Sequence, residues 1–584
     1  MPPAEAKPPP NNRRRPPPGS PAAGSPPRRR LRSDAACPAA ADDAAASSDP
    51  YAASLSPFLL RLDADWAALR ATLPAHQRVR MEGVDPAALG AREALRLASR
   101  YPRKWGHPSH DAPPSVRRHF AAHAAALLAL SKMAPPPPLE EPSEASSFRV
   151  ALAGDCMWLR DTWDGSWLSG RVGALLGACA GGLVANLETP LHEACSPPPA
   201  LSWRLQAGLP DCVAYSSPAA FADAFPAKTA WSVANNHALD VGAAGARATL
   251  AALSSRGMPC SGLRDGAAAP TWCRFERSSG AQGAERCSVG LYAATFGVNL
   301  PASMAAAVAA GVVVQTVPGL ALASAGRVAP PPPLHSDDAP SSAPPRVDLS
   351  EAVAALGSMA AAGVGFRVVS LHMGHEFEGW PTAAQMAVAR ALVAAGADLV
   401  LGAHAHLQHP SEVLLVDGYE GRGEAERAAL RGVPHESRVA SAGAKTAGGA
   451  LPPPPPRKAL VLYGLGNFCS TMFNELCRVG LLATLKLNPP EGMESGAPWG
   501  WSLPEWHWLY NEAAVLRGAA MGAPPRRLLL VRSDCGTSTE HCPDDRADDS
   551  VAALLGPRKR RLVDFTRDHV FGGEEARVAP TFRL

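Results

Sequence analysis

Two histidines, His404 and His406, stand two positions apart in the stretch "LGAHAHLQHP", directly after the apolar run "DLVLGA". At the two-residue period of a β-strand both imidazole rings would project to one side, where a single metal ion could contact both. Two ligands are too few for a metal site, and an isolated pair of this kind is also explained as two loop histidines. The hypothesis therefore depends on ligands from elsewhere in the chain.

Polar residues follow several other apolar runs. The run "VALAGD" ends in Asp155, and "LVANLE" ends with Asn186 and Glu188. The run "SVANNH" ends with Asn235, Asn236 and His237, and "VVSLHMGHE" ends with His372 and Glu376. Each residue alone has a structural explanation, such as a helix cap or a core histidine. Because strand carboxyl ends converge at one edge of an α/β sheet, the set as a whole predicts a shared pocket. Its carboxylate, amide and imidazole groups suit divalent Mn, Fe or Zn.

The elements that must position these residues are short apolar strands alternating with helical runs such as 242–257 and 382–397. This alternation predicts an α/β domain with a largely parallel core. Residues 51–134 instead carry apolar side chains three and four positions apart, which predicts a small helical module before that domain.

Composition suggests where the chain departs from this domain. Residues 1–50 are rich in Pro, Ala, Ser and Arg and are predicted to be a disordered tail. Insertions are predicted at about 265–287, 327–347 and 419–457, and a C-terminal extension at 491–584. The insertion at 419–457 is long enough to act as a lid.

Charge and cysteine content limit the classes of partner. The chain of 584 residues has a net charge of +3, but residues 1–33 hold eight Lys or Arg against one acid, a local +7 that leaves about −4 elsewhere. We therefore expect no nucleic-acid binding. Twelve cysteines without a C-x-x-C pair favour reduced thiols and an intracellular location. The start lacks a secretory apolar core but is compatible with an organelle transit peptide, and no run predicts a transmembrane segment. Compartment and oligomeric state stay open.

The ordered strings "GDCM", "NLETPL", "ANNHALDVG", "LHMGHE", "GADLVLGAHAHLQHPSE" and "YGLGNF" fall between about residues 148 and 490. They resemble the capsule-synthesis CapA (poly-γ-glutamate biosynthesis) family, a branch of the calcineurin-like metallophosphoesterases. The resemblance implies a four-layer α/β/β/α sandwich with a two-metal centre at the strand ends. The helical module and the N-terminal tail lie outside it.

The same resemblance implies a role for each motif residue. One metal would be bound by Asp155 and His406, the second by Asn236, His372 and His404, and Glu188 would bridge both. His237 would stand beside the metals as the general acid. Asn235, Asp240 and Gly242 match the motif and are expected to support the ligands, whereas Gly466, Asn467 and Phe468 are interpreted as structural.

The first motif departs from the wider superfamily, which has Asp-x-His there and an Asp at the end of the second motif. This chain has Met157 and Glu188 at those places, as the CapA-like family does. A thioether is a poor ligand for hard or borderline divalent ions. We therefore predict that the ion held by Asp155 and His406 binds more weakly than the other.

These observations predict a hydrolase that uses one or two divalent ions on an anionic small-molecule or polymer substrate. The bond would be a phosphoester or a γ-glutamyl or other amide, with a link to polyglutamate or capsule-type polymer metabolism. Arg160 and Glu376 are candidate substrate-binding residues, although a surface charge explains Arg160 equally well. The alternative is a non-catalytic scaffold, stabilised by metal, or a polymer-binding module.

Overall fold

The computed structural model describes only part of the chain. The described residues are 50–72, 112–131, 148–157, 171–179, 181–192, 216–277, 287–299, 301–320, 347–442, 445–446, 449–450, 456–470, 476–488, 499–512, 527–534, 566 and 569–570. They all belong to one compact unit, residues 47–584. The predicted disordered tail lies outside the described residues except for Pro50.

The first sheet has eight strands among the described residues, in the order β19-β18-β17-β1-β2-β3-β4, with β16 beside β1. Its strands are β1 (Phe148–Cys156), β2 (Leu183–Leu187), β3 (Thr229–Ser232), β4 (Cys260–Ser261), β16 (Asn467–Cys469), β17 (Val479–Asn488), β18 (Gly500–Glu512) and β19 (Arg527–Asp534). Strands β1 to β4 are parallel, whereas β17, β18 and β19 are antiparallel to their neighbours. The carboxyl ends of β1, β2 and β3 therefore meet at one edge.

The second sheet has seven strands in the described part of the chain, in the order β12-β11-β15-β10-β9-β7-β6. They are β6 (Trp272–Arg277), β7 (Cys287–Thr295), β9 (Phe366–His372), β10 (Leu399–Ala403), β11 (Ser411–Val416), β12 (Arg438–Val439) and β15 (Arg457–Leu462). Strands β7, β9, β10 and β15 form its parallel centre. Their continuous apolar sequences fit strands covered on both faces.

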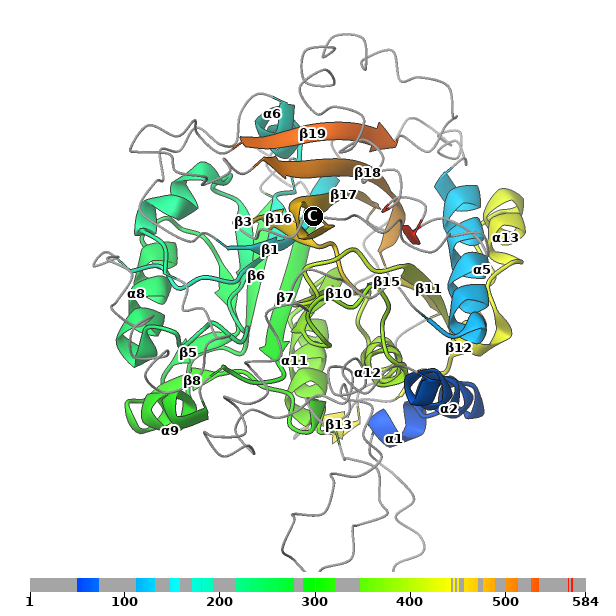
Figure 1. The fold of residues 1–584 in the computed structure, drawn as a ribbon, viewed down its shortest axis with the longest axis horizontal. Coiled ribbons are helices and arrows are strands. Elements are labelled where there is room, and N and C mark those ends of the chain that lie inside the picture. The colour runs from blue at the N-terminus through cyan, green and yellow to red at the C-terminus, as the bar shows by residue number, and fades with distance from the viewer. Residues whose placement is uncertain are drawn as a thin grey trace, which may run out of the picture. The chain divides into compact units, whose positions relative to one another are not determined.

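The two sheets pack face to face, with helices on the two outer faces (Figure 1). Leu152 and Val184 of the first sheet share one buried cluster with Val368, Leu401 and Leu462 of the second. Helices α6 (Arg171–Ala178) and α8 (Gly242–Ser254) contribute to a cluster with the first sheet, and α11 (Ser350–Ala361) and α12 (Ala383–Ala394) to one with the second. The predicted α/β/β/α layering is confirmed.

The helices predicted for residues 51–134 pack directly against this sandwich. Helices α1 (Pro50–Ser54) and α2 (Pro57–Thr72) contact α12, and α5 (Pro114–Ser131) contacts β11 and β18. Leu59 and Phe120 belong to the same buried cluster as Leu392 of α12. Residues 73–111 of the predicted module lie outside the described residues.

The regions predicted to be insertions or a C-terminal extension contain parts of both sheets. The segment 265–287 contains β6, and 491–584 contains β18 and β19. The segment 419–457 contains α13 (Glu424–Leu430), η2 (His435–Ser437) and β12, and α13 contacts α5, so this part is packed on the sandwich. The segment 327–347 lies outside the described residues except for Val347. Of these strands β6, β12 and β19 are at sheet edges, whereas β18 pairs with both β17 and β19.

The smaller elements complete the description. They are η1 (Ala219–Ala224), β5 (Leu263–Asp265), α9 (Pro301–Ala309), β8 (Val312–Val314), β13 (Lys445–Thr446), β14 (Gly449–Ala450) and η3 (Leu476–Arg478). Of the helices that the structure describes, none has both the length and the apolar character needed to cross a membrane.

Candidate metal centre

Polar residues from the ends of five strands meet at one edge of the two sheets. We call them the strand-end cluster, and its members are Asp155, Glu188, Asn236, His372, His404 and His406. Their exposed fractions run from 0% to 6%. Two triads of ligand atoms, each within 4.8 Å of one another, come from this set: Glu188 with His372 and His404, and Glu188 with Asp155 and His406. Glu188 is common to both triads, which is the arrangement that a carboxylate between two ions requires.

The two histidines of "HAH" do not reach this cluster through strand alternation. Strand β10 ends at Ala403, and both His404 (φ 94°) and His406 (φ 57°) have left-handed backbone conformations. The backbone N–H of His404 donates to Oδ2 of Asp155 at 3.2 Å, which ties this bend to β1. Left-handed conformations cost roughly 1–2 kcal/mol for a residue with a side chain, and they concentrate at functional sites. The extended geometry predicted for this pair is therefore wrong, although the imidazole centroids still lie 6.1 Å apart.

The first triad gains an amide oxygen from the loop after β3. Nε2 of His372 lies 2.8 Å from Oδ1 of Asn236 and 3.4 Å from Oε1 of Glu188. Two ligands that are each 2.0–2.2 Å from one ion are separated by roughly 3.0–3.5 Å. These atoms already have nearly that spacing.

The second triad is centred on His406. Its Nδ1 lies 3.3 Å from Oδ2 of Asp155 and 3.9 Å from Oε2 of Glu188. The same nitrogen is 3.0 Å from Oδ1 of Asn467, so a residue interpreted from the sequence as structural contacts a candidate ligand. Asn186 was also left out of the predicted ligand set, and its Nδ2 donates to Oδ1 of Asp155 at 2.8 Å. Asn186 lies near the end of β2, which is the signal that identified the ligands, whereas Asn467 is the first residue of β16 and carries no such signal.

Several polar atoms of the cluster have no hydrogen-bond partner among the described residues. Neither carboxylate oxygen of the buried Glu188 has a hydrogen-bond partner among the described residues, and the same holds for Nδ1 of His404. Burial, reinforced by Asp155 and Glu376, raises the pKa of Glu188 well above its ordinary range. A buried carboxylate without a cation is costly, and a divalent ion would supply the missing charge. The residues present therefore fit a divalent metal ion.

The imidazoles differ in their protonation. Burial, together with the neighbouring histidines, lowers the pKa values of His372 and His404 well below the ordinary range. Burial also acts to lower the pKa of His406, but its hydrogen bond to Asp155 and the charge of that carboxylate raise it overall. Neutral imidazoles at His372 and His404 are the form that ligates metals.

His237 stands beside the cluster and is held by a carboxylate. Its Nδ1 lies 2.7 Å from Oδ2 of Asp240 and 3.3 Å from Nδ2 of Asn299. Asn299 in turn accepts a hydrogen bond from Nδ2 of Asn236 at 3.1 Å, so it links His237 to a candidate ligand. The sequence interpretation missed Asn299, which comes four residues after the end of β7.

The two predicted substrate-binding residues have different outcomes. Arg160 lies outside the described residues. Glu376 is partly buried, and its ligand atom forms a third triad with those of His404 and His406, all within 4.8 Å of one another.

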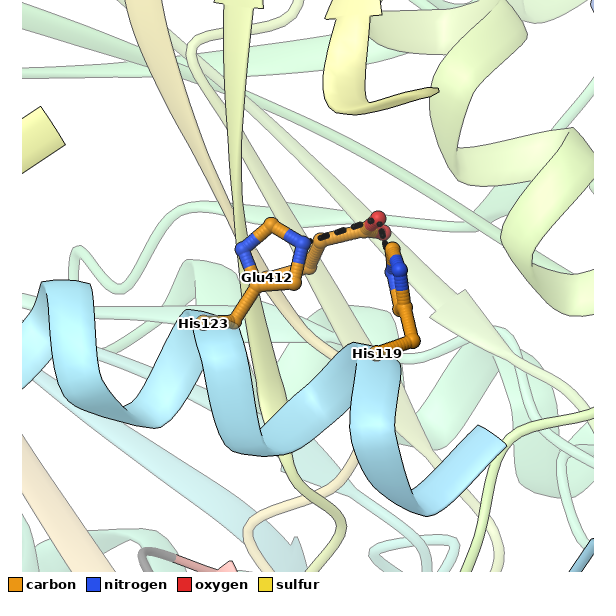
Figure 2. A group of neighbouring side chains, drawn as sticks. All are labelled: His119, His123 and Glu412. Atoms are coloured by element: carbon orange, nitrogen blue, oxygen red, sulfur yellow. Dashed lines mark hydrogen bonds and ion pairs between the residues drawn. The ribbon is translucent and has the colours of Figure 1, made fainter. Parts of the chain in front are cut away.

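A second group of histidines and a glutamate was not predicted from the sequence. We call His119, His123 and Glu412 the helix-α5 cluster, and Figure 2 shows both imidazoles projecting from one helix toward the carboxylate. Their ligand atoms also lie within 4.8 Å of one another. Glu412, however, accepts hydrogen bonds from Nη2 of Arg390 and from the Tyr463 hydroxyl, the latter at 2.7 Å. Its charge is already matched by a buried cation.

The fold and the strand-end cluster together define an α/β/β/α protein with a candidate divalent-metal centre. Residues 149–472, more than half of the chain, match the family model described as bacterial capsule synthesis protein PGA_cap. The chain belongs to this family, which confirms the family predicted from the motifs.

Two further comparisons add little to this assignment. The solved structure of the calcineurin-like phosphoesterase YfkN from Bacillus subtilis is similar at 13% identity, covers 72% of this chain and 99% of that chain, and has a TM-score of 0.30. At that score the likeness supports no argument about this chain. No curated protein matches.

Proposed function

We propose that this protein is a divalent-metal-dependent hydrolase. The observation that carries the proposal is Glu188, a buried carboxylate that is common to two ligand triads and has no hydrogen-bond partner among the described residues. A structural carboxylate would be neutralised by the protein itself, as buried polar groups normally are.

Each triad would hold one ion. Asp155, Glu188 and His406 would hold the first, and Glu188, Asn236, His372 and His404 the second. When bound, divalent ions at these positions would lower the pKa of a water molecule and neutralise negative charge on the substrate. The protein's own contribution is to fix these donors in a buried site, where their geometry is maintained by the bends after β9 and β10.

His237 has the arrangement expected of a general acid. If Asp240 accepts the Nδ1 proton across the 2.7 Å contact, Nε2 is left to hold the proton that passes to the leaving group. The contact with Asp240 would thus fix the tautomer and orientation of the ring. Neither ligand triad includes His237, so this imidazole is not needed to hold an ion.

The family description supports an anionic polymer, or a precursor of one, as the substrate class. A phosphoester and a γ-glutamyl amide are both compatible with the proposed centre, because each develops negative charge on oxygen during hydrolysis. Such charge would be met by ions bound to the two triads.

The test is an assay of the full chain with an aryl phosphate and with a γ-glutamyl anilide, each with and without manganese. We expect turnover of one of them that depends on manganese. His435→Ala, at a histidine of η2 outside the strand-end cluster, is the matched control for histidine variants of the site and should keep wild-type activity. Failure of metal-loaded protein to turn over either compound would overturn the hydrolase proposal in favour of the scaffold.

A further inference from the structure

The ion that Asp155 and His406 would hold has few ligands. The inference drawn from this rests on the proposed function. Asp155, Glu188 and His406 supply three donors there. Met157, directly after β1, is fully buried, and a thioether would in any case be a poor ligand for Mn, Fe or Zn. A three-donor site buried in protein would gain from a fourth oxygen or nitrogen ligand.

Glu376 is the side chain placed to provide that ligand. Its ligand atom lies within 4.8 Å of those of His404 and His406, one imidazole from each triad. Ligands around one ion are roughly 3.0–3.5 Å apart, so a shift of about an ångström would bring the carboxylate into coordination range of the ion beside His406. This side chain is partly exposed, so such a rotation is available to it.

The backbone of Glu376 is tied to the bend that carries the two histidines. The N–H of the next residue, Phe377, donates to the carbonyl of Ala405 at 2.9 Å, and Ala405 separates His404 from His406. The Phe377 ring lies 5.9 Å from the His406 ring, and the residue has a left-handed backbone conformation (φ 65°). Strained backbone that holds one residue against a ligand loop is expected where position matters.

We propose that Glu376 is a ligand of the ion held by Asp155 and His406, and that it takes the place that Met157 cannot fill. The competing role is the one predicted from the sequence, in which the carboxylate contacts the substrate. The two roles differ in what the protein does without any substrate, because only a ligand changes metal affinity.

The experiment is a manganese titration of the full chain after removal of metal, with free Mn²⁺ followed by electron paramagnetic resonance. Wild type should bind two ions with unequal affinities. In Glu376→Gln the weaker affinity should fall by about ten-fold or more, while the tighter one changes by less than about two-fold. Glu378→Gln, the same isosteric change two residues along the same loop, is the control and should match wild type.

Two further measurements separate the outcomes. Unfolding of Glu376→Gln in EDTA should match that of wild type, which shows that the metal-free fold is intact. Met157→His, added to Glu376→Gln, should restore the weaker affinity, because an imidazole at residue 157 would replace the lost donor. If wild type binds two ions and Glu376→Gln binds both equally well, the ligand role is overturned while the proposed function stands. If wild type binds no ion, the ligand role of Glu376 and the proposed metal-dependent function are both overturned.

Discussion

The strand-end cluster and the helix-α5 cluster have similar composition and opposite electrostatics. Each contains buried histidines and a buried glutamate whose ligand atoms lie within 4.8 Å of one another. Around Glu412 the protein supplies Arg390, Tyr463 and His119 as donors, whereas around Glu188 it supplies no hydrogen-bond donor among the described residues. The distances alone therefore do not identify a metal site, and the balance of charge does.

The pKa values of the two glutamates show the same difference. Burial raises the pKa of Glu188, and nearby carboxylates raise it further. Burial also acts to raise the pKa of Glu412, but Arg390, followed by His119 and His123, lowers it below the ordinary value of 4.5. Glu412 is thus an ionised partner that joins α5, β11 and α12, whereas Glu188 is a buried carboxyl group without a hydrogen-bond partner among the described residues.

The role of the second cluster is visible in its bonds. The N–H of Val413 donates to Nδ1 of His123 at 3.3 Å, which leaves Nε2–H to donate to the Ser437 hydroxyl at 2.9 Å. Burial lowers the pKa of His123 well below its ordinary range, so this ring is neutral. With its acceptor nitrogen used by the backbone, His123 acts as a structural tie between α5 and β11.

The largest effect should follow from removing a ligand of the strand-end cluster. His404→Ala and Glu188→Ala are each expected to abolish metal-dependent hydrolysis, a loss of about 10⁴-fold or more, because the ions are no longer held. Metal content of the purified variants, measured with the rate, checks this. His123→Ala removes a histidine of the helix-α5 cluster and should keep its metal. Metal retained in His404→Ala or Glu188→Ala would contradict the assignment of these residues as ligands.

The next effect concerns proton transfer without loss of metal. His237→Ala should lower the rate by about 10²–10⁴-fold while metal content stays at the wild-type level. Asp240→Asn should give a smaller loss, because the ring loses the carboxylate that holds its Nδ1. Equal rates for His237→Ala and wild type would remove His237 from the chemistry.

The third effect is on stability and distinguishes the two glutamates directly. Glu412→Gln should lower the free energy of unfolding by about 3–5 kcal/mol at neutral pH, because Arg390 is left buried without its counter-charge. In EDTA, Glu188→Gln should leave the free energy of unfolding unchanged or raise it, since the metal-free site disfavours the ionised carboxyl group. Denaturant unfolding of both variants measures this. Similar losses of unfolding free energy in the two would show that the two glutamates do not differ in how the protein neutralises them.

The pH dependence of Glu412→Gln sharpens the same test. Because the pKa of Glu412 is lower in the folded protein than its ordinary value of 4.5, its stabilisation is fully present above about pH 4.5. It is lost as the pH falls from there toward the folded-state pKa. The stability difference between wild type and Glu412→Gln should therefore shrink below about pH 4.5, and a constant difference would argue that Glu412 is not ionised.

The smallest effect should come from one hydrogen bond of the second cluster. Tyr463→Phe removes the hydroxyl that donates to Glu412 at 2.7 Å and should cost about 1.5–3 kcal/mol of stability. Manganese affinity should not change, since Tyr463 contacts the helix-α5 cluster and not the ligand triads. A weakened metal affinity would show that the two clusters are coupled.

The sequence by itself indicated the α/β fold with a largely parallel core and the set of strand-end residues. Its motifs indicated the family, and the family resemblance in turn implied the four layers. Asp155, Glu188, Asn236 and His372 could be found because parallel strands end at a common edge, so a local pattern implies a shared location. Which donors would bind which ion, however, came from the family resemblance and stays a proposal.

Only the tertiary structure decided contacts that no local pattern encodes. His119 and Glu412 are 293 residues apart, and their meeting depends on how α5 packs on β11. The bend at His404 and His406 likewise depends on Asp155, which lies on another sheet and accepts the His404 N–H. A single strand's sequence specifies its own alternation, but the backbone conformation after its end is set by the partners that tertiary packing brings there.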